Sequence, residues 1–148
     1  MRFGEDMFAL NILIDKCRAV FISHYGGYYY CQRNGSATTT AFTPDKALDL
    51  SRLRFALFES AIRFKIDSYR WFCDAVGANI DAWNYYGACD ELRGRLLKLN
   101  EYKTEAINNN DSDYINKHLI IKLALLQSPL FAAKVNKIIL KIRRLIRL

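Results

Sequence analysis

The spacing of apolar residues from residue 43 onward sets the main limit on what this chain can form. Thr43-Pro44-Asp45 is a typical helix start, with Thr as the N-cap, Pro at the first helical position and an acid near the positive end of the helix dipole. The apolar residues that follow recur every three or four positions, and they include Leu50, Leu53, Leu57, Ala61, Phe64 and Phe72. We therefore expect one long helix that ends near Val76-Gly77, where the glycine would form the C-cap.

Further helices are expected over the rest of the chain. Helical spacing continues near residues 80–108, 113–126 and 129–147. The Asn108-Asn109-Asn110 run and Ser128-Pro129 interrupt it. Residues 43–127 are thus predicted to form a mainly α-helical extension, and residues 128–148 a C-terminal helix.

The first 42 residues show a different pattern. Residues 5–18 have the spacing of a buried helix with an acidic first turn. Short β-branched and aromatic runs at 19–22 and 28–31 flank Gly26-Gly27, which predicts a strand, a turn and a second strand, and a polar loop follows. The expected fold class is therefore α/β, with a helix and a short strand pair ahead of the helical extension.

Basic residues gather at the end of the chain. Eight of the 22 Lys and Arg lie after residue 113, where there is no Asp or Glu, so the first 113 residues carry 14 basic against 15 acidic side chains. The net charge of +7 therefore comes from the tail. Net charge is informative about binding partners and not about the fold. This tail lacks the interleaved aromatic residues that bind single-stranded nucleic acid, and we expect no nucleic-acid partner.

Several other function classes lack sequence support. Cys17, Cys31, Cys73 and Cys89 are widely spaced and form no C-x-x-C pair, which favours reduced thiols and predicts no metal site. The N-terminus has no apolar core of a signal peptide, and Lys or Arg interrupts each candidate apolar stretch before it reaches about 20 residues. We expect a cytoplasmic protein without a transmembrane helix.

Three segments near the N-terminus occur in an order that is similar to a known signature. They are Phe3-Gly4-Glu5-Asp6-Met7-Phe8, then residues 17–22, and then Tyr28-Tyr29-Tyr30 with Arg33 and Ser36 behind it. Residues 1–42 with these segments resemble the C-terminal part of the catalytic domain of family 2 glycosyltransferases, which are inverting enzymes of the GT-A type. Taken alone, the Glu5-Asp6 pair also fits a simple cap at a helix N-terminus.

The resemblance implies a reaction and roles for four residues. In this family the Asp of the E-D pair is the base that takes a proton from the acceptor hydroxyl, so Asp6 is the expected catalytic base, and Glu5 orients the acceptor or Asp6. Arg33 and Ser36 are expected to bind the diphosphate or the acceptor, with a solvated loop as the alternative. The implied substrates are a nucleotide-sugar donor and a glycan or lipid-linked acceptor, in cell-surface polysaccharide synthesis.

Enzymes of this family also need a nucleotide-binding half. That half holds Mg²⁺ or Mn²⁺ on the donor diphosphate through a D-x-D motif and precedes the E-D pair, whereas only five residues precede Asp6 here. The literal Asp111-Ser112-Asp113 motif follows three asparagines and opens a predicted helix, which favours an N-cap. We therefore expect a truncated fragment that binds no metal and is inactive alone.

The last predicted helix is strongly amphipathic. An apolar stripe is formed by Phe131, Val135, Ile138, Ile139, Ile142, Leu145 and Ile146, and the other side carries Lys134, Lys137, Lys141, Arg144 and Arg147. One interpretation is that these basic residues contact an anionic membrane at the inner face of the plasma membrane. The other is a terminal helix packed on its neighbours with a solvated cationic face. A non-catalytic helical protein that binds the membrane surface or a protein partner is thus the alternative to the enzyme fragment.

Overall fold

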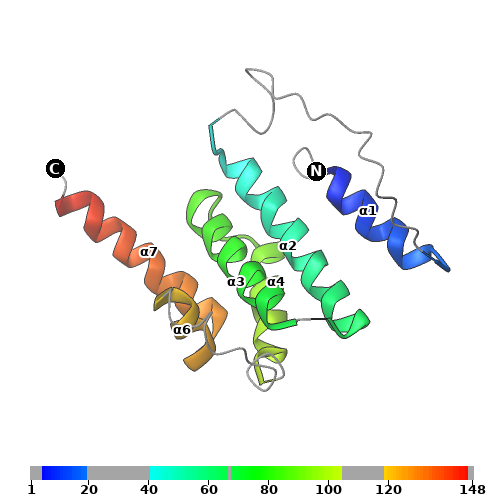
Figure 1. Cartoon of the computed structure of the whole chain (residues 1–148). Helices are drawn as coiled ribbons and strands as arrows, with labels where there is room; N and C mark the ends of the chain where they lie inside the picture. The colour runs from blue at the N-terminus through cyan, green and yellow to red at the C-terminus, as the bar shows by residue number, and fades with distance from the viewer. Residues whose placement is uncertain (1–4, 20–40, 67, 105–118, 147–148) are drawn as a thin grey trace.

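The computed structural model describes residues 5–19, 41–66, 68–104 and 119–146. The helices in these ranges are α1 (Glu5–Lys16), α2 (Pro44–Phe64), α3 (Ser68–Tyr85), α4 (Asp90–Glu101), α6 (Leu119–Leu126) and α7 (Pro129–Ile146). The central bundle consists of α2, α3 and α4 (Figure 1). α6 and α7 pack against α3, while α1 lies against α2 on the other side.

The predicted α/β class is wrong, because the described residues form α-helices and contain no strand. The strands expected at 19–22 and 28–31 lie outside the described residues, apart from Ala19, which belongs to no strand. An isolated pair of short strands is only marginally stable unless a further strand or a helix covers it. A local run of β-branched and aromatic residues does not indicate whether another strand or a helix packs against it.

α2 begins as the sequence predicts but ends early. Thr43 Oγ1 accepts a hydrogen bond from the N–H of Lys46 at 3.2 Å, which confirms the expected N-cap. The helix ends at Phe64 and the chain turns back into α3, so the single helix expected from 43 to 77 is wrong. Gly77 lies inside α3 and is not a C-cap. A single helix of that length could not cover its own apolar stripe, whereas two adjacent helices cover each other.

A Schellman motif ends α2 and starts this reversal. Lys65 adopts the left-handed backbone conformation with φ of 53°. The N–H of Lys65 donates to the carbonyl of Ile62 at 3.2 Å, and the N–H of Ile66 donates to the carbonyl of Ala61 at 3.1 Å. The motif is usually built on glycine, because other residues are strained in this conformation. Because Lys65 occupies the position where glycine is usual, the sequence does not indicate that a helix ends here.

A second turn divides the helix expected near residues 80–108. α3 ends at Tyr85 and α4 begins at Asp90, and Gly87 between them has φ of 105°. Only glycine adopts this conformation without strain. The boundary predicted at Ser128-Pro129 is confirmed, since α7 begins at Pro129 and Ser128 Oγ accepts a hydrogen bond from the N–H of Phe131 at 3.1 Å.

Aromatic rings from three parts of the chain meet in the core. Phe58 on α2 is fully buried, and its ring makes edge-to-face contacts with Phe72 on α3 and with Tyr102 just after α4. The ring centroids are 5.7 Å and 5.4 Å apart, respectively. α7 joins the same core through the small residues Ala132 and Ala133. The C-terminal helix therefore shares its core with the central bundle.

A polar network ties α2, α3 and α4 together. Arg52 Nε and Nη2 each donate to the Glu91 carboxylate at 2.7 Å. The mostly buried Arg95 also donates to Glu91, and it reaches Asn79 Oδ1 at 2.8 Å and Ser51 Oγ at 2.9 Å. The hydrogen bond from Arg52, with further help from Arg95, lowers the pKa of Glu91 to about 2 against the opposing effect of burial.

Substitution of Gly87 and of Gly77 by Ala should change stability in opposite directions. Gly87→Ala forces a residue with a Cβ into φ of 105° and should lower the free energy of unfolding by about 1–3 kcal/mol. Gly77→Ala adds a methyl group inside α3 with no atom within 4 Å, and it should raise that free energy by about 0.5–1 kcal/mol. Urea unfolding followed by circular dichroism measures both values. Changes of the same sign would contradict these helix boundaries.

Glu91→Gln should destabilise the protein near neutral pH and much less near pH 2. Folding lowers the pKa of Glu91 from 4.5 to about 2, so its contribution is complete above the unfolded value and is lost as the pH falls through the folded value. Because Glu91 is partly exposed, we expect a loss of at most about 1 kcal/mol. Urea midpoints of both proteins across this pH range test the role, with Glu101→Gln as a control in the same helix. A difference that does not vary with pH would contradict it.

Candidate functional site

Asp6 lies in the first turn of α1, as the sequence predicts, and it is exposed. Its Oδ1 accepts a hydrogen bond from the N–H of Met7 at 2.8 Å. Glu5 is the first residue of α1, but its side chain lies outside the described residues, as do Arg33 and Ser36. One of the four predicted enzyme residues is therefore placed with its side chain.

α1 is not the buried helix that its spacing predicts. Five of its six large apolar side chains, Met7, Leu10, Ile12, Leu13 and Ile14, are exposed by 38 to 58%, and Phe8 is half-buried. They point in several directions around the helix, whereas the main contact of α1 among the described helices is with α2. One neighbour cannot cover all of these directions. Much of the apolar surface of α1 is therefore left uncovered by the described part of the chain.

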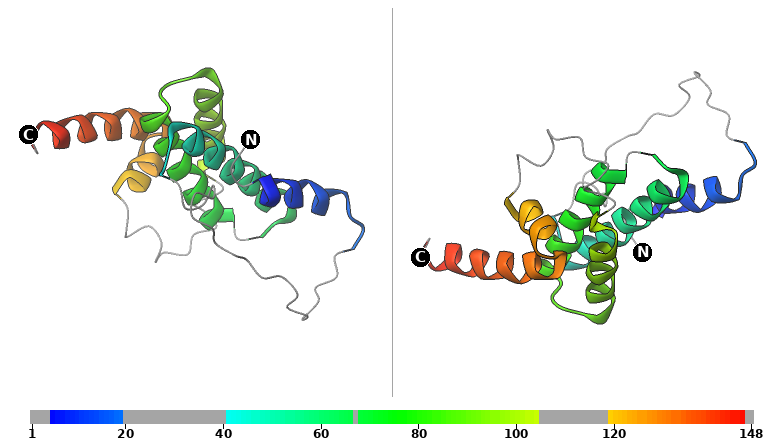
Figure 2. Two further views of the ribbon diagram at one scale, coloured as in Figure 1. Left: turned by 90° about the horizontal axis from the view of Figure 1, so that it is seen from above. Right: turned by 90° about the horizontal axis from the view of Figure 1, so that it is seen from below.

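α7 carries four of the five predicted membrane contacts. Lys134, Lys137, Lys141 and Arg144 belong to this helix, and Arg147 lies outside the described residues. The structure adds Arg143, an exposed residue of the last turn that the sequence pattern does not include. The outer part of α7 projects beyond the bundle in both views of Figure 2. None of the helices in the described ranges has the length and apolar character needed to cross a bilayer.

The two candidate sites lie on different sides of the molecule. α1 packs on α2, whereas α7 packs on α3, α4 and α6. Figures 1 and 2 place the two helices on opposite sides of the central bundle in every view. Asp6 and the basic residues of α7 therefore do not combine into one site.

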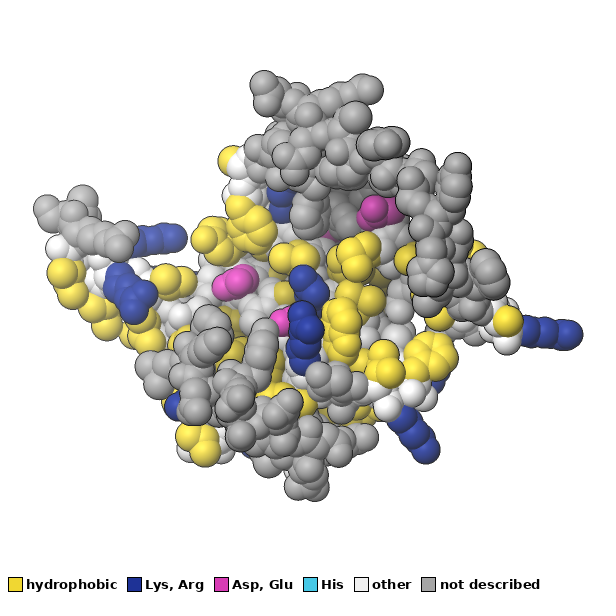
Figure 3. Space-filling model, in the orientation of Figure 1, with side chains coloured by type: hydrophobic (Ala, Val, Ile, Leu, Met, Phe, Trp, Pro, Cys, Tyr) yellow, Lys and Arg dark blue, Asp and Glu magenta, His cyan; other side chains and the backbone are white. Residues whose placement is uncertain are grey.

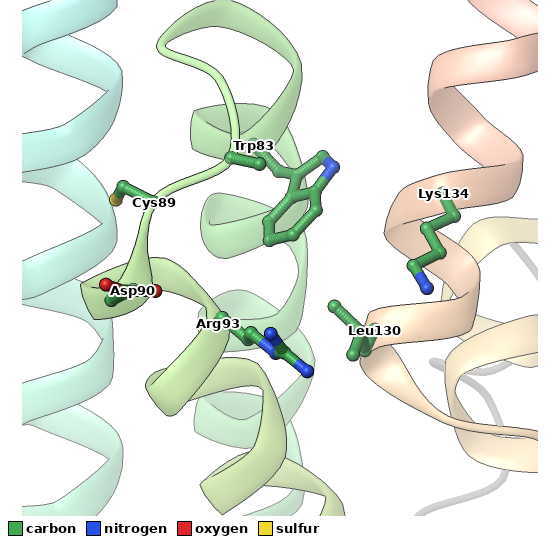
Figure 4. Close-up of a pocket in the computed structure, with 7 residues that line it drawn as sticks. Trp83, Cys89, Asp90, Arg93, Leu130 and Lys134 are labelled. Carbon is green, nitrogen blue, oxygen red and sulfur yellow. The ribbon is translucent and has the colours of Figure 1, made fainter.

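A pocket between the start of α4 and α7 was missed by sequence reasoning. Its volume is about 260 Å³, and its lining consists of Trp83, Ala88, Cys89, Asp90, Arg93, Leu130 and Lys134. Arg93 and Lys134 reach into the gap between α4 and α7, beside the indole of Trp83 (Figure 4). These residues come from three separate helices and the turn between two of them, so no local spacing connects them. Lys134 therefore belongs to the basic face of α7 and also lines this pocket.

A second pocket, of about 400 Å³, lies among α2, α3, α6 and α7. Arg54 and Asp74 line it and form an ion pair at 3.3 Å, and Asp81 and Asn136 add further polar groups. This ion pair balances the charges of Arg54 and Asp74, and it leaves Asp81 as the remaining acidic residue of the lining. Asp6 belongs to neither pocket.

The described residues do not fit the divalent cation that the resemblance implies. Among them, no group of three or more His, Cys, Asp or Glu side chains is placed to hold a metal ion. Asp111-Ser112-Asp113 lies outside the described ranges. The described residues therefore give no basis for assigning a reaction step to Mg²⁺ or Mn²⁺.

Comparison with protein-family models, with curated proteins and with solved structures found no match to this chain.

Proposed function

We propose that this chain supplies the acceptor-activating part of an inverting glycosyltransferase. The donor would be a nucleotide sugar, and the acceptor a glycan or lipid-linked hydroxyl in cell-surface polysaccharide synthesis. The observation that carries the proposal is the ordered sequence signature that starts at Phe3 and has Asp6 in the first turn of a helix. The proposal includes a cytoplasmic location, where such a reaction would meet its acceptor at the inner face of the plasma membrane.

The chemistry assigns a specific task to Asp6. One carboxylate oxygen takes the proton of the acceptor hydroxyl while the hydroxyl oxygen attacks the anomeric carbon. The bond from that carbon to the nucleoside diphosphate breaks on the opposite face, and the diphosphate leaves with the electron pair. Asp6 suits this role because it is exposed and lies at a helix N-terminus, and its Oδ1 is oriented by the N–H of Met7.

The exposed apolar side chains of α1 support the same proposal. A helix whose apolar residues point in several directions needs neighbours on several sides, and α2 provides one of them. We propose that a nucleotide-binding domain covers the remaining apolar surface around Leu10 and Leu13 in the active enzyme. Contact with that domain would bring Asp6 next to the donor. Arg33 and Ser36 keep their proposed role in binding the diphosphate or the acceptor.

Asp6→Asn should abolish sugar transfer without unfolding the protein. Removal of a general base typically costs about 10²- to 10⁴-fold in rate. The substitution is introduced into the chain in its own cells, and transfer of labelled sugar from a panel of nucleotide sugars to membrane-derived acceptors is measured in extracts.

Asp45→Asn is the matched control, because Asp45 is also an exposed acid in the first turn of a helix. This variant should keep transfer near the level of the unmodified chain. Unchanged transfer by Asp6→Asn would rule out the assigned base. Equal losses in both variants would point to a structural role for Asp6.

A non-catalytic helical protein is the second candidate function. The described residues form helices and no strand, which favours this candidate, as does the exposed amphipathic helix α7. This candidate predicts that Asp6→Asn leaves the cellular role of the chain intact, whereas the enzyme proposal predicts its loss. The same variant therefore separates the two functions.

A further inference from the structure

Most of the apolar stripe of α7 faces away from the bundle, and its members Val135 and Ile139 are half-buried. Side chains of the stripe are largely exposed: Phe131 by 46%, Ile138 by 57%, Ile142 by 49% and Leu145 by 72%. Their spacing of seven, four and three residues places them on one face of the helix.

The face of α7 that packs on the bundle is a different one. It consists of Pro129, Ala132 and Ala133, which are buried. At about 100° per residue, this face lies roughly opposite the apolar stripe. The alternative interpretation, a terminal helix packed on its neighbours with a solvated cationic face, agrees with the packing through these residues, but the exposed members of the apolar stripe take no part in that packing. The bundle packs mainly on the small residues of α7, with Leu130 partly buried beside them, and it leaves the side chains of Ile138, Ile142 and Leu145 exposed.

The charges of α7 indicate what covers this stripe. The helix contains Lys134, Lys137, Lys141, Arg143 and Arg144 and no acidic residue. Figure 3 shows Lys and Arg side chains beside the hydrophobic side chains along α7, at the left of the view. A second copy of the chain docked through the stripe would bring these cations close to the same cations of its partner. An anionic surface has the complementary charge.

The shape of α7 also suits a flat surface. Its outer part projects from the bundle, so no described helix covers the stripe there (Figure 2). A helix of 18 residues is about 27 Å long, and this one carries too much charge to cross a bilayer. A large apolar stripe flanked by cations is typical of helices that lie in the interface of a membrane.

We propose that α7 binds the surface of anionic membranes, with Ile138, Ile142 and Leu145 inserted among the lipid chains. Lys141 and Arg144 contact the phosphate headgroups beside the stripe. The inner part of the helix stays packed on the bundle through Ala132 and Ala133. The proposal does not depend on glycosyl transfer, because it rests on residues far from Asp6.

Co-sedimentation of the full 148-residue chain with vesicles tests this binding. We expect binding to vesicles of equal parts phosphatidylcholine and phosphatidylglycerol, and little binding to phosphatidylcholine alone. High salt should weaken the binding, because it screens the attraction between the helix and the headgroups. Equal binding to both kinds of vesicle, or binding to neither, would overturn the proposal.

Two double variants test the two parts of the interaction. Lys141→Gln with Arg144→Gln should weaken binding roughly 30-fold, because each cation contributes about a factor of five or more near the surface. Ile138→Ser with Ile142→Ser should weaken it at least about 10-fold through lost insertion. All four side chains are exposed or largely so, and circular dichroism should show an unchanged fold.

Matched controls remove the same groups elsewhere on the surface. Lys16→Gln with Arg18→Gln removes two exposed cations near the end of α1, and Phe64→Ser with Leu97→Ser removes two exposed apolar side chains from α2 and α4. Both controls should bind vesicles as the unmodified chain does. Equal losses in the controls would overturn the assignment to α7. So would dimerisation in solution that the Ile138/Ile142 variant abolishes, since a second copy would then be the occupant.

Discussion

The reversal of the chain at Lys65 is the constraint on which the rest of the structure depends. Because Lys65 adopts a left-handed conformation, α2 ends at Phe64 and α3 returns alongside it. The pairing of these two helices brings Phe58 onto Phe72, and it creates the surface on which α4, α6 and α7 assemble. Without this turn the apolar residues from 43 to 77 would form one continuous stripe with no partner from the same segment.

Aromatic packing and charged hydrogen bonds hold the core formed in this way, whereas both ends of the chain leave large apolar side chains exposed. Arg52, Glu91 and Arg95 join the central helices through charged hydrogen bonds, which resist local opening. By contrast, α1 and the outer part of α7 expose large apolar side chains on opposite sides of the bundle. Exposed apolar surface of this kind marks sites of interaction. Both proposals made for this chain, glycosyl transfer at α1 and membrane contact at α7, lie at these two ends.

The sequence predicted parts of each candidate site but not their surroundings. It predicted the helix start that contains Asp6 and the amphipathic helix that contains four of the basic residues, because acids at helix starts and amphipathic patterns are local features. It missed Arg143 and the pocket beside Trp83, which depends on three helices meeting. It also predicted a strand pair and an α/β class, which is wrong for the described residues, since strand pairing depends on contacts that a short local run does not encode.

The sequence by itself determined where several helices begin and how charge is distributed. Thr43 and Ser128-Pro129 mark helix starts because capping involves neighbouring residues only, and the basic tail follows from residue counts. Tertiary structure decided which face of each helix is buried. Amphipathicity shows that α7 has an apolar stripe, but not whether the bundle covers it. Packing through Ala132 and Ala133 turned the stripe outward, because small residues let α7 approach the bundle closely while Ile138 and Ile142 remain on the far side.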